Sequence, residues 1–189
     1  MTIARQIGAM TLANTVYLLS QLAVLIALTR FSDLATVAQF GFVMAVVQPL
    51  YMLGLLGLRT AQATDADDDF AFATYLGLRS VMLFVFVVIA LGGLLGLRPG
   101  YAGLAVPIVL AKAVEMLCDL CYGAMQRDGK VDLVARSLLL RGPLAALTFA
   151  IFLAAGATVP MAFFAHFLIW ALVFVAHDLP RTAAFAGSI

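Results

Sequence analysis

Ionisable side chains recur along one predicted face of a strongly apolar stretch near the middle of the chain. Lys112, Glu115 and Asp119 lie three and four residues apart, and Tyr122 and Gln126 continue the same series. Such spacings place side chains on one face of a helix. Each ionised group in the middle of a bilayer costs about 2.5–3.5 kcal/mol on insertion scales, so this face requires protein or water against it. A structural Lys112–Glu115 ion pair and the polar wall of a substrate or ion cavity both account for the pattern.

The first apolar stretch carries a milder polar series. Asn14, Tyr17 and Gln21 share a predicted helical face, and Gln48 followed by Pro49 lies in the second stretch. Interhelical hydrogen bonds, worth about 0.6 kcal/mol on average in membranes, explain each residue alone. Together with the ionisable series, they predict a partly hydrated interior.

Basic residues gather near the ends of several apolar stretches, where they are Arg59, Arg79, Arg127, Lys130, Arg136 and Arg141. Arginine at headgroup level bridges phosphate oxygens bidentately, which makes this group a candidate phosphate site. Charge asymmetry between the two sides of a membrane also explains them, and snorkelling explains Arg79 and Arg141 in particular.

Acidic residues occur in two of the segments that connect the apolar stretches. The first segment carries Asp65, Asp67, Asp68 and Asp69, and the second carries Asp128 and Asp132. Mg²⁺ prefers the oxygens of carboxylates and lipid diphosphates as ligands, so these acidic runs could hold it. The ordinary explanation of an acidic run is a solvated loop. An alternative function is therefore a Mg²⁺-dependent lipid-modifying transferase that uses Asp65, Asp68, Asp128 and Asp132. The sequence contains no Ser-His-Asp pattern, phosphate loop or dinucleotide fingerprint, so we otherwise expect no enzyme, cofactor or bound metal. His166, Trp170 and the His177–Asp178 pair are interpreted as packing and interfacial residues.

The amino-acid composition of the chain indicates the kind of structure that carries these residues. Of the 189 residues, 65% are hydrophobic and 11% are charged, and the mean hydropathy is +1.09. A soluble domain has roughly 25% charged residues. A bilayer is therefore the solvent that suits this chain, and no basic run suggests nucleic acid as a partner.

Six apolar segments each approach the ~20 residues that a membrane-spanning helix needs. They lie at about 8–29, 37–58, 76–97, 102–125, 137–156 and 158–177. We expect an all-α integral membrane bundle of six transmembrane helices that forms a single domain over residues 1–189.

The distribution of Lys and Arg predicts the orientation of this bundle. If the N-terminus is cytoplasmic, the inner side holds Arg5, Arg59, Arg79, Arg127, Lys130, Arg136, Arg141 and Arg181, and the outer side holds Arg30 and Arg98. This asymmetry favours two cytoplasmic termini.

The order of the polar motifs resembles a known family. The motifs are Asn14-x-x-Tyr17-x-x-x-Gln21, Gln48–Pro49, Leu58–Arg59 with Ala63–Thr64–Asp65, Tyr75 with Arg79, and then Glu115, Asp119, Tyr122–Gly123, Gln126–Arg127, Asp132, Ser137 and Arg141–Gly142. In this order they resemble the N-terminal half of bacterial oligosaccharide flippases, the polysaccharide-biosynthesis membrane proteins of the multidrug/oligosaccharidyl-lipid/polysaccharide superfamily.

This resemblance implies one lobe of a two-lobed transporter that moves a lipid-linked oligosaccharide across the bacterial inner membrane by alternating access. It makes Arg59, Arg79 and Arg141 candidate contacts of the lipid diphosphate. It makes a second group candidate cavity or coupling residues, namely Asn14, Gln21, Lys112, Glu115 and Asp119.

The six spans correspond to one lobe, whereas family members usually have twelve or more. Alternating access requires two units around a central site, so we expect either a missing second six-helix lobe or a homodimer. A non-catalytic subunit of a larger membrane assembly is the remaining alternative.

Overall fold

The protein is a bundle of long antiparallel helices. The structure, a computed structural model, describes residues 3–65 and 70–186. The helices are α1 (Ile3–Phe31), α2 (Leu34–Leu55), α3 (Leu58–Thr64), α4 (Phe72–Leu97), α5 (Ala102–Arg127), α6 (Val131–Ala154), α7 (Val159–Val173) and α8 (Leu179–Ala186), with a 3₁₀ turn at Pro99–Tyr101 and a π-helical turn at Phe174–Asp178. No strand occurs in these two ranges, and the prediction of an all-α membrane bundle is confirmed.

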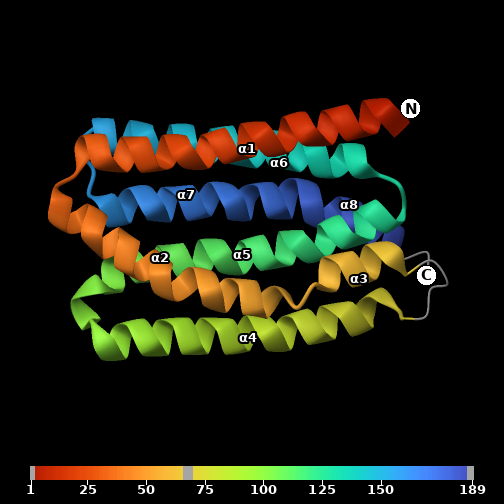
Figure 1. Ribbon diagram of the computed structural model, residues 1–189, viewed down its shortest axis with the longest axis horizontal. Coiled ribbons are helices and arrows are strands. Elements are labelled where there is room, and N and C mark those ends of the chain that lie inside the picture. Colours follow the sequence, from red (N-terminus) through yellow and green to blue (C-terminus); the bar gives the residue numbers. More distant parts are fainter. Residues whose placement is uncertain (1–2, 66–69, 187–189) are drawn as a thin grey trace.

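Most of the long helices are suited to a bilayer. Among the described residues, five helical stretches are long and apolar enough to cross a membrane: Arg5–Phe31, Leu34–Thr64, Phe72–Leu97, Val131–Ala154 and Val159–Ala184. Helix α5 has 26 residues but differs from these, because every 18-residue stretch of it contains Lys112, Glu115 and Asp119. It runs alongside the other helices in Figure 1, so its charges lie within a multi-pass membrane protein.

Helix α5 occupies the interior of the bundle. Figure 1 shows α1 lying along α6, while α5 runs between α7 on one side and α2 and α4 on the other. The chain crosses the length of the bundle an even number of times, so the start of α1 and helix α8 lie at the same end. The buried apolar core, which includes Val47, Phe86, Val109 and Phe149, fills the opposite half.

The second predicted span is divided by a break that its apolar pattern does not indicate. Helix α2 ends at Leu55, and Leu56 (φ 48°) and Gly57 (φ 65°) both adopt left-handed backbone before α3 begins. Glycine accepts this conformation at little cost, whereas leucine rarely does. The break turns the short helix α3, which carries Arg59, toward α5.

Two glycines allow helices to approach closely next to the site. A Cβ atom on Gly142 of α6 would lie 3.2 Å from Cα of Tyr17 on α1, and one on Gly123 of α5 would lie 3.2 Å from Cα of Arg59 on α3. Small residues permit such backbone contacts in membranes. These contacts bring Tyr17 and Arg59 to the same region of α5 and α6.

Candidate functional site

The ionisable series of α5 begins with an ion pair that tyrosines of α1 and α2 stabilise. Lys112 Nζ lies 2.8 Å from Glu115 Oε2, which confirms the predicted ion pair. The Tyr17 hydroxyl of α1 donates to Glu115 Oε1 over 2.8 Å, and the Lys112 ammonium lies 4.6 Å from the centroid of the Tyr51 ring of α2. Both carboxylate oxygens therefore have a donor, as a charge buried in a membrane requires.

Asp119, one turn further along α5, holds two arginines from different helices. Arg79 Nη2 of α4 donates to Asp119 Oδ2 over 2.8 Å, and Arg59 Nη1 of α3 lies at 3.7 Å from Oδ1. Arg79 Nη1 also donates to the Gly54 carbonyl, and Arg59 Nε donates to Gln126. The longer distance leaves Arg59 the more loosely held of the two guanidinium groups.

Arg141 of α6 is a buried cation surrounded by aromatic rings. Its guanidinium carbon lies 4.6 Å from the centroid of Trp170, 5.3 Å from Tyr17 and 5.6 Å from Tyr122. The residue is 2% exposed, and its Nε and Nη1 have no hydrogen-bond partner among the described residues. Ring faces attract a desolvated cation but leave its N–H groups available for an acceptor. The snorkelling interpretation is wrong for Arg141 and Arg79, since both side chains are buried inside the bundle.

These groups enclose a small polar cavity, which we call the cationic cavity. Its volume is about 130 Å³, and it is lined by Asn14, Tyr17, Tyr51, Arg59, Glu115, Asp119, Tyr122, Leu138 and Arg141. Its walls and their direct ion-pair partners contain four cations, Lys112, Arg59, Arg79 and Arg141, against two carboxylates. The formal net charge is therefore two positive, which favours an anionic ligand in a region of low dielectric constant.

The structure brings most of the predicted site residues together. Arg59, Arg141, Asn14, Glu115 and Asp119 line the cationic cavity. Arg79 is not a lining residue but pairs with Asp119, which is one. Two further predicted residues, Lys112 and Gln21, line a separate smaller cavity.

A second polar network was not predicted. Tyr122 Oη and Ser137 Oγ are 2.6 Å apart, Ser137 Oγ donates to Asp178 Oδ2 over 3.0 Å, and Asp178 Oδ1 lies 2.8 Å from His177 Nδ1. His177 and Asp178 are buried at the π-helical turn, which confirms the packing part of their interpretation as packing and interfacial residues. Through Tyr122, this network reaches the wall of the cationic cavity.

The acidic loops do not form a cluster in the part of the chain that the structure describes. Asp65 accepts a hydrogen bond from the Tyr75 hydroxyl over 3.0 Å, and Asp132 lies 3.8 Å from Arg136. Asp128 is exposed, and Asp68 lies outside the described residues, as do Asp67 and Asp69. Within residues 3–65 and 70–186, no three His, Cys, Asp or Glu side chains are grouped so that they could hold a metal ion.

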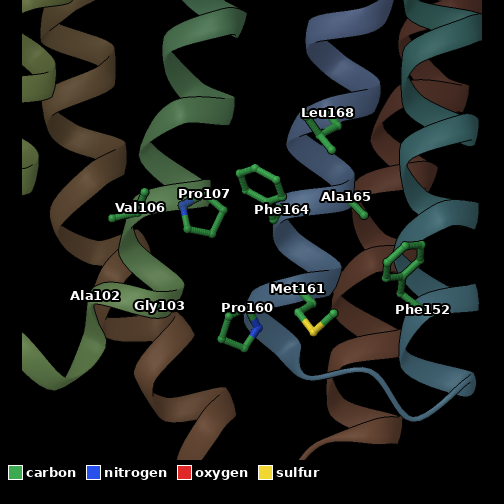
Figure 2. Close-up of a pocket in the computed structure, with 10 residues that line it drawn as sticks. All are labelled: Ala102, Gly103, Val106, Pro107, Phe152, Pro160, Met161, Phe164, Ala165 and Leu168. Atoms are coloured by element: carbon green, nitrogen blue, oxygen red, sulfur yellow. The ribbon is translucent and has the colours of Figure 1, made fainter.

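A larger cavity is apolar and lies away from this chemistry. It has a volume of about 580 Å³ and lies mainly between α5 and α7, where Pro107, Phe164 and Met161 line it (Figure 2). None of the ten lining residues is ionisable, so this cavity suits apolar groups rather than a charged ligand.

Comparison with known protein families, with characterised proteins and with solved structures found no match to this chain. The assignment to a class of membrane protein therefore depends on the residues and their geometry.

Proposed function

We propose that this chain is one lobe of a flippase-like transporter that moves a lipid-linked oligosaccharide across the bacterial inner membrane. The observation that carries this proposal is the state of Arg141. It is a buried cation beside the cationic cavity, and two of its N–H groups have no acceptor among the described residues. A phosphate group is the acceptor that best suits the planar donor set of a guanidinium.

The size of the cationic cavity supports the diphosphate rather than the sugar as the group bound there. Its volume of about 130 Å³ is below the ~300–1,000 Å³ of pockets for drug-sized ligands. We therefore place the phosphate groups between Arg141 and Arg59, with the oligosaccharide extending beyond the lobe. Arg59 is suited to exchange Asp119 for a phosphate because its contact with that carboxylate is long, at 3.7 Å.

The transport step requires no covalent chemistry. A flippase works by stabilising its charged ligand differently in inward-facing and outward-facing states. Such a cycle needs two units that move around a central site, so the lobe would act with a second six-helix lobe or with a second copy of itself. Asn14 supports this arrangement. It lines the cavity and is also exposed at the surface of α1, so the cavity reaches a face on which a second unit would pack. In this proposal both termini are cytoplasmic, with the arginine-rich end of the bundle facing the lipid-linked substrate as it is made.

The proposal is tested with the full chain reconstituted in proteoliposomes. A fluorescent lipid diphosphate sugar is placed in both leaflets, and a membrane-impermeant quencher reports how fast its head group crosses. We expect translocation by the wild-type chain and at least about tenfold slower translocation by Arg141→Gln, since one lost charge-assisted hydrogen bond corresponds to about that factor. Arg136→Gln is the matched control, because its side chain is on the same helix but 67% exposed.

Two results would contradict the proposal. One is the absence of head-group translocation by the chain both as isolated and as a covalently cross-linked dimer. The other is an equal loss of rate in the Arg136 and Arg141 variants, which would indicate a general effect of charge instead of a site.

A further inference from the structure

A second polar cavity lies between α1, α2, α5 and α7, and we call it the tryptophan cavity. Its volume is about 90 Å³, and its polar lining residues are Gln21, Lys112, His166 and Trp170. Its other lining residues are apolar: Val24, Leu25, Phe40, Met44, Ile108, Ala111 and Phe163. The cavity is therefore an apolar chamber into which α1, α5 and α7 bring a few polar groups.

Two of the four polar side chains have a buried N–H group without an acceptor. Gln21 Nε2 and Trp170 Nε1 have no hydrogen-bond partner in the described part of the chain. His166 is 5% exposed and Trp170 is 2% exposed. Buried polar groups in proteins almost always have a partner, so nitrogens gathered around one cavity indicate a ligand that accepts hydrogen bonds.

The charged residues around the tryptophan cavity indicate whether that ligand is an anion or a cation. Lys112 is its ionised lining residue, and no carboxylate is among the eleven lining residues that the structure places there. Glu115 pairs with Lys112 but lines the cationic cavity instead. On the far side, the guanidinium of Arg141 lies 4.6 Å from the Trp170 ring and adds to the positive potential. An anion is favoured here, whereas Na⁺ or K⁺ would lack oxygen ligands with negative charge.

Volume and chemistry then limit the class of anion. A cavity needs about 10–15 Å³ of free volume to hold one water molecule, so about 90 Å³ holds a small ion with a few water molecules. The ammonium of Lys112 has three N–H donors, of which one is directed to Glu115. The indole N–H, the amide NH₂ and a remaining ammonium N–H are donors that complement a halide.

We infer that the tryptophan cavity binds a small monovalent anion of the halide class, held by Gln21, Lys112 and Trp170. This site is separate from the cationic cavity and does not depend on the proposed transport function. A bound anion would compete with Glu115 for the ammonium of Lys112. The occupancy of one cavity would thereby influence a wall of the other.

The experiment uses the fact that Trp170 is the single tryptophan of the chain. The full chain is placed in nanodiscs of zwitterionic lipid, and its tryptophan fluorescence is followed while bromide replaces gluconate at constant ionic strength and constant cation. We expect saturable quenching that chloride displaces. Gln21→Leu should raise the half-saturating bromide concentration about tenfold, because it removes one hydrogen bond to a charged ligand. Gln48→Leu is the matched control, since Gln48 does not line this cavity, and it should leave the titration unchanged.

Three outcomes would overturn the inference. Quenching that rises linearly without saturation would indicate collision only. An equal titration curve for wild type and Gln21→Leu would show that the amide holds no ligand. A response that follows exchange of Na⁺ for K⁺ at constant anion would indicate a cation site. If Gln21→Leu does not fold, the saturation of the wild-type curve and its displacement by chloride are readouts that need no variant.

Discussion

Arg79 and Asp119 join two membrane-embedded helices through a contact of 2.8 Å between Nη2 and Oδ2. The Arg79 side chain is fully buried, and that of Asp119 is 16% exposed. Removing one partner of such a pair leaves an uncompensated charge in a medium of low dielectric constant. This pair therefore holds α4 against α5, and it also fixes the carboxylate that lines the cationic cavity.

The first prediction concerns this pair. Asp119→Asn should lower the free energy of unfolding by about 3 kcal/mol, because Arg79 would remain buried without a carboxylate. The double variant Arg79→Met/Asp119→Leu should recover most of that loss. Reversible unfolding in mixed micelles of detergent and dodecyl sulfate measures both values. The exposed pair of Asp132 and Arg136 is the control, and Asp132→Asn should cost less than about 1 kcal/mol. A double variant as unstable as the single one would contradict this account.

The second prediction separates the hydroxyl of Tyr17 from its ring. Tyr17→Phe removes the hydrogen bond to Glu115 and should destabilise the protein by about 1 kcal/mol. It keeps the ring that faces Arg141, so affinity for a lipid diphosphate should change less than about twofold. Tyr17→Leu removes the ring and should weaken binding at least about fivefold, since a desolvated cation–π contact is worth about 1–2 kcal/mol. Binding is measured by fluorescence anisotropy in nanodiscs, and equal affinities for the two variants would show that the ring does not position Arg141.

The third prediction tests the close approach of α3 to α5. Gly123→Ala places a methyl group 3.2 Å from both Cα and the carbonyl oxygen of Arg59, so α3 must shift. We expect a loss of about 1–3 kcal/mol in stability, together with weaker lipid diphosphate binding. Gly77→Ala in α4 is the matched control, because its Cβ would meet nothing within 4 Å. That control should be neutral or stabilising by up to about 1 kcal/mol. Similar unfolding curves for both variants would show that α3 packs more loosely than the structure indicates.

The fourth prediction is a pH dependence at the start of α2. The Asp33 carboxylate accepts the Thr36 amide at 2.9 Å, and this hydrogen bond lowers the pKa of Asp33 below its ordinary value. The stabilisation is present above the unfolded pKa and is lost as pH falls through the lower folded pKa, that is, below about pH 4. Asp33→Asn should therefore lose less stability than wild type between pH 6 and pH 3. Unfolding at these two pH values measures the difference, and parallel curves would refute it.

Local patterns in the sequence were sufficient for part of this structure. The Lys112–Glu115 pair follows from a spacing of three residues on one helix, and helical geometry fixes that distance without any information on packing. Apolar length predicted an all-α bundle in the same way. By contrast, Tyr17 and Glu115 are 98 residues apart, so the sequence could indicate only that each lies on a polar face.

The rest depends on packing between helices that are distant in the sequence. The rings around Arg141 come from α1, α5 and α7, and no spacing along the chain encodes their convergence. Ser137 and Asp178 meet over 41 residues through a π-helical turn that has no simple sequence signature. The break after Leu55 had a local signal in Gly57, but the apolar run around it resembled a continuous helix.

The depth of Arg141 has an electrical consequence. It is the eleventh residue of a helix that begins at Val131, so it lies about 15 Å along a span that crosses ~30 Å of hydrocarbon. Moving one elementary charge through 100 mV corresponds to about 2.3 kcal/mol. In the proposed orientation, with the first turn of α6 on the cytoplasmic side, an anion that travels from the cytoplasm to Arg141 crosses part of the transmembrane voltage, and a potential that is negative inside favours its outward movement. The transmembrane voltage would therefore act directly on the step in which the anion binds at Arg141.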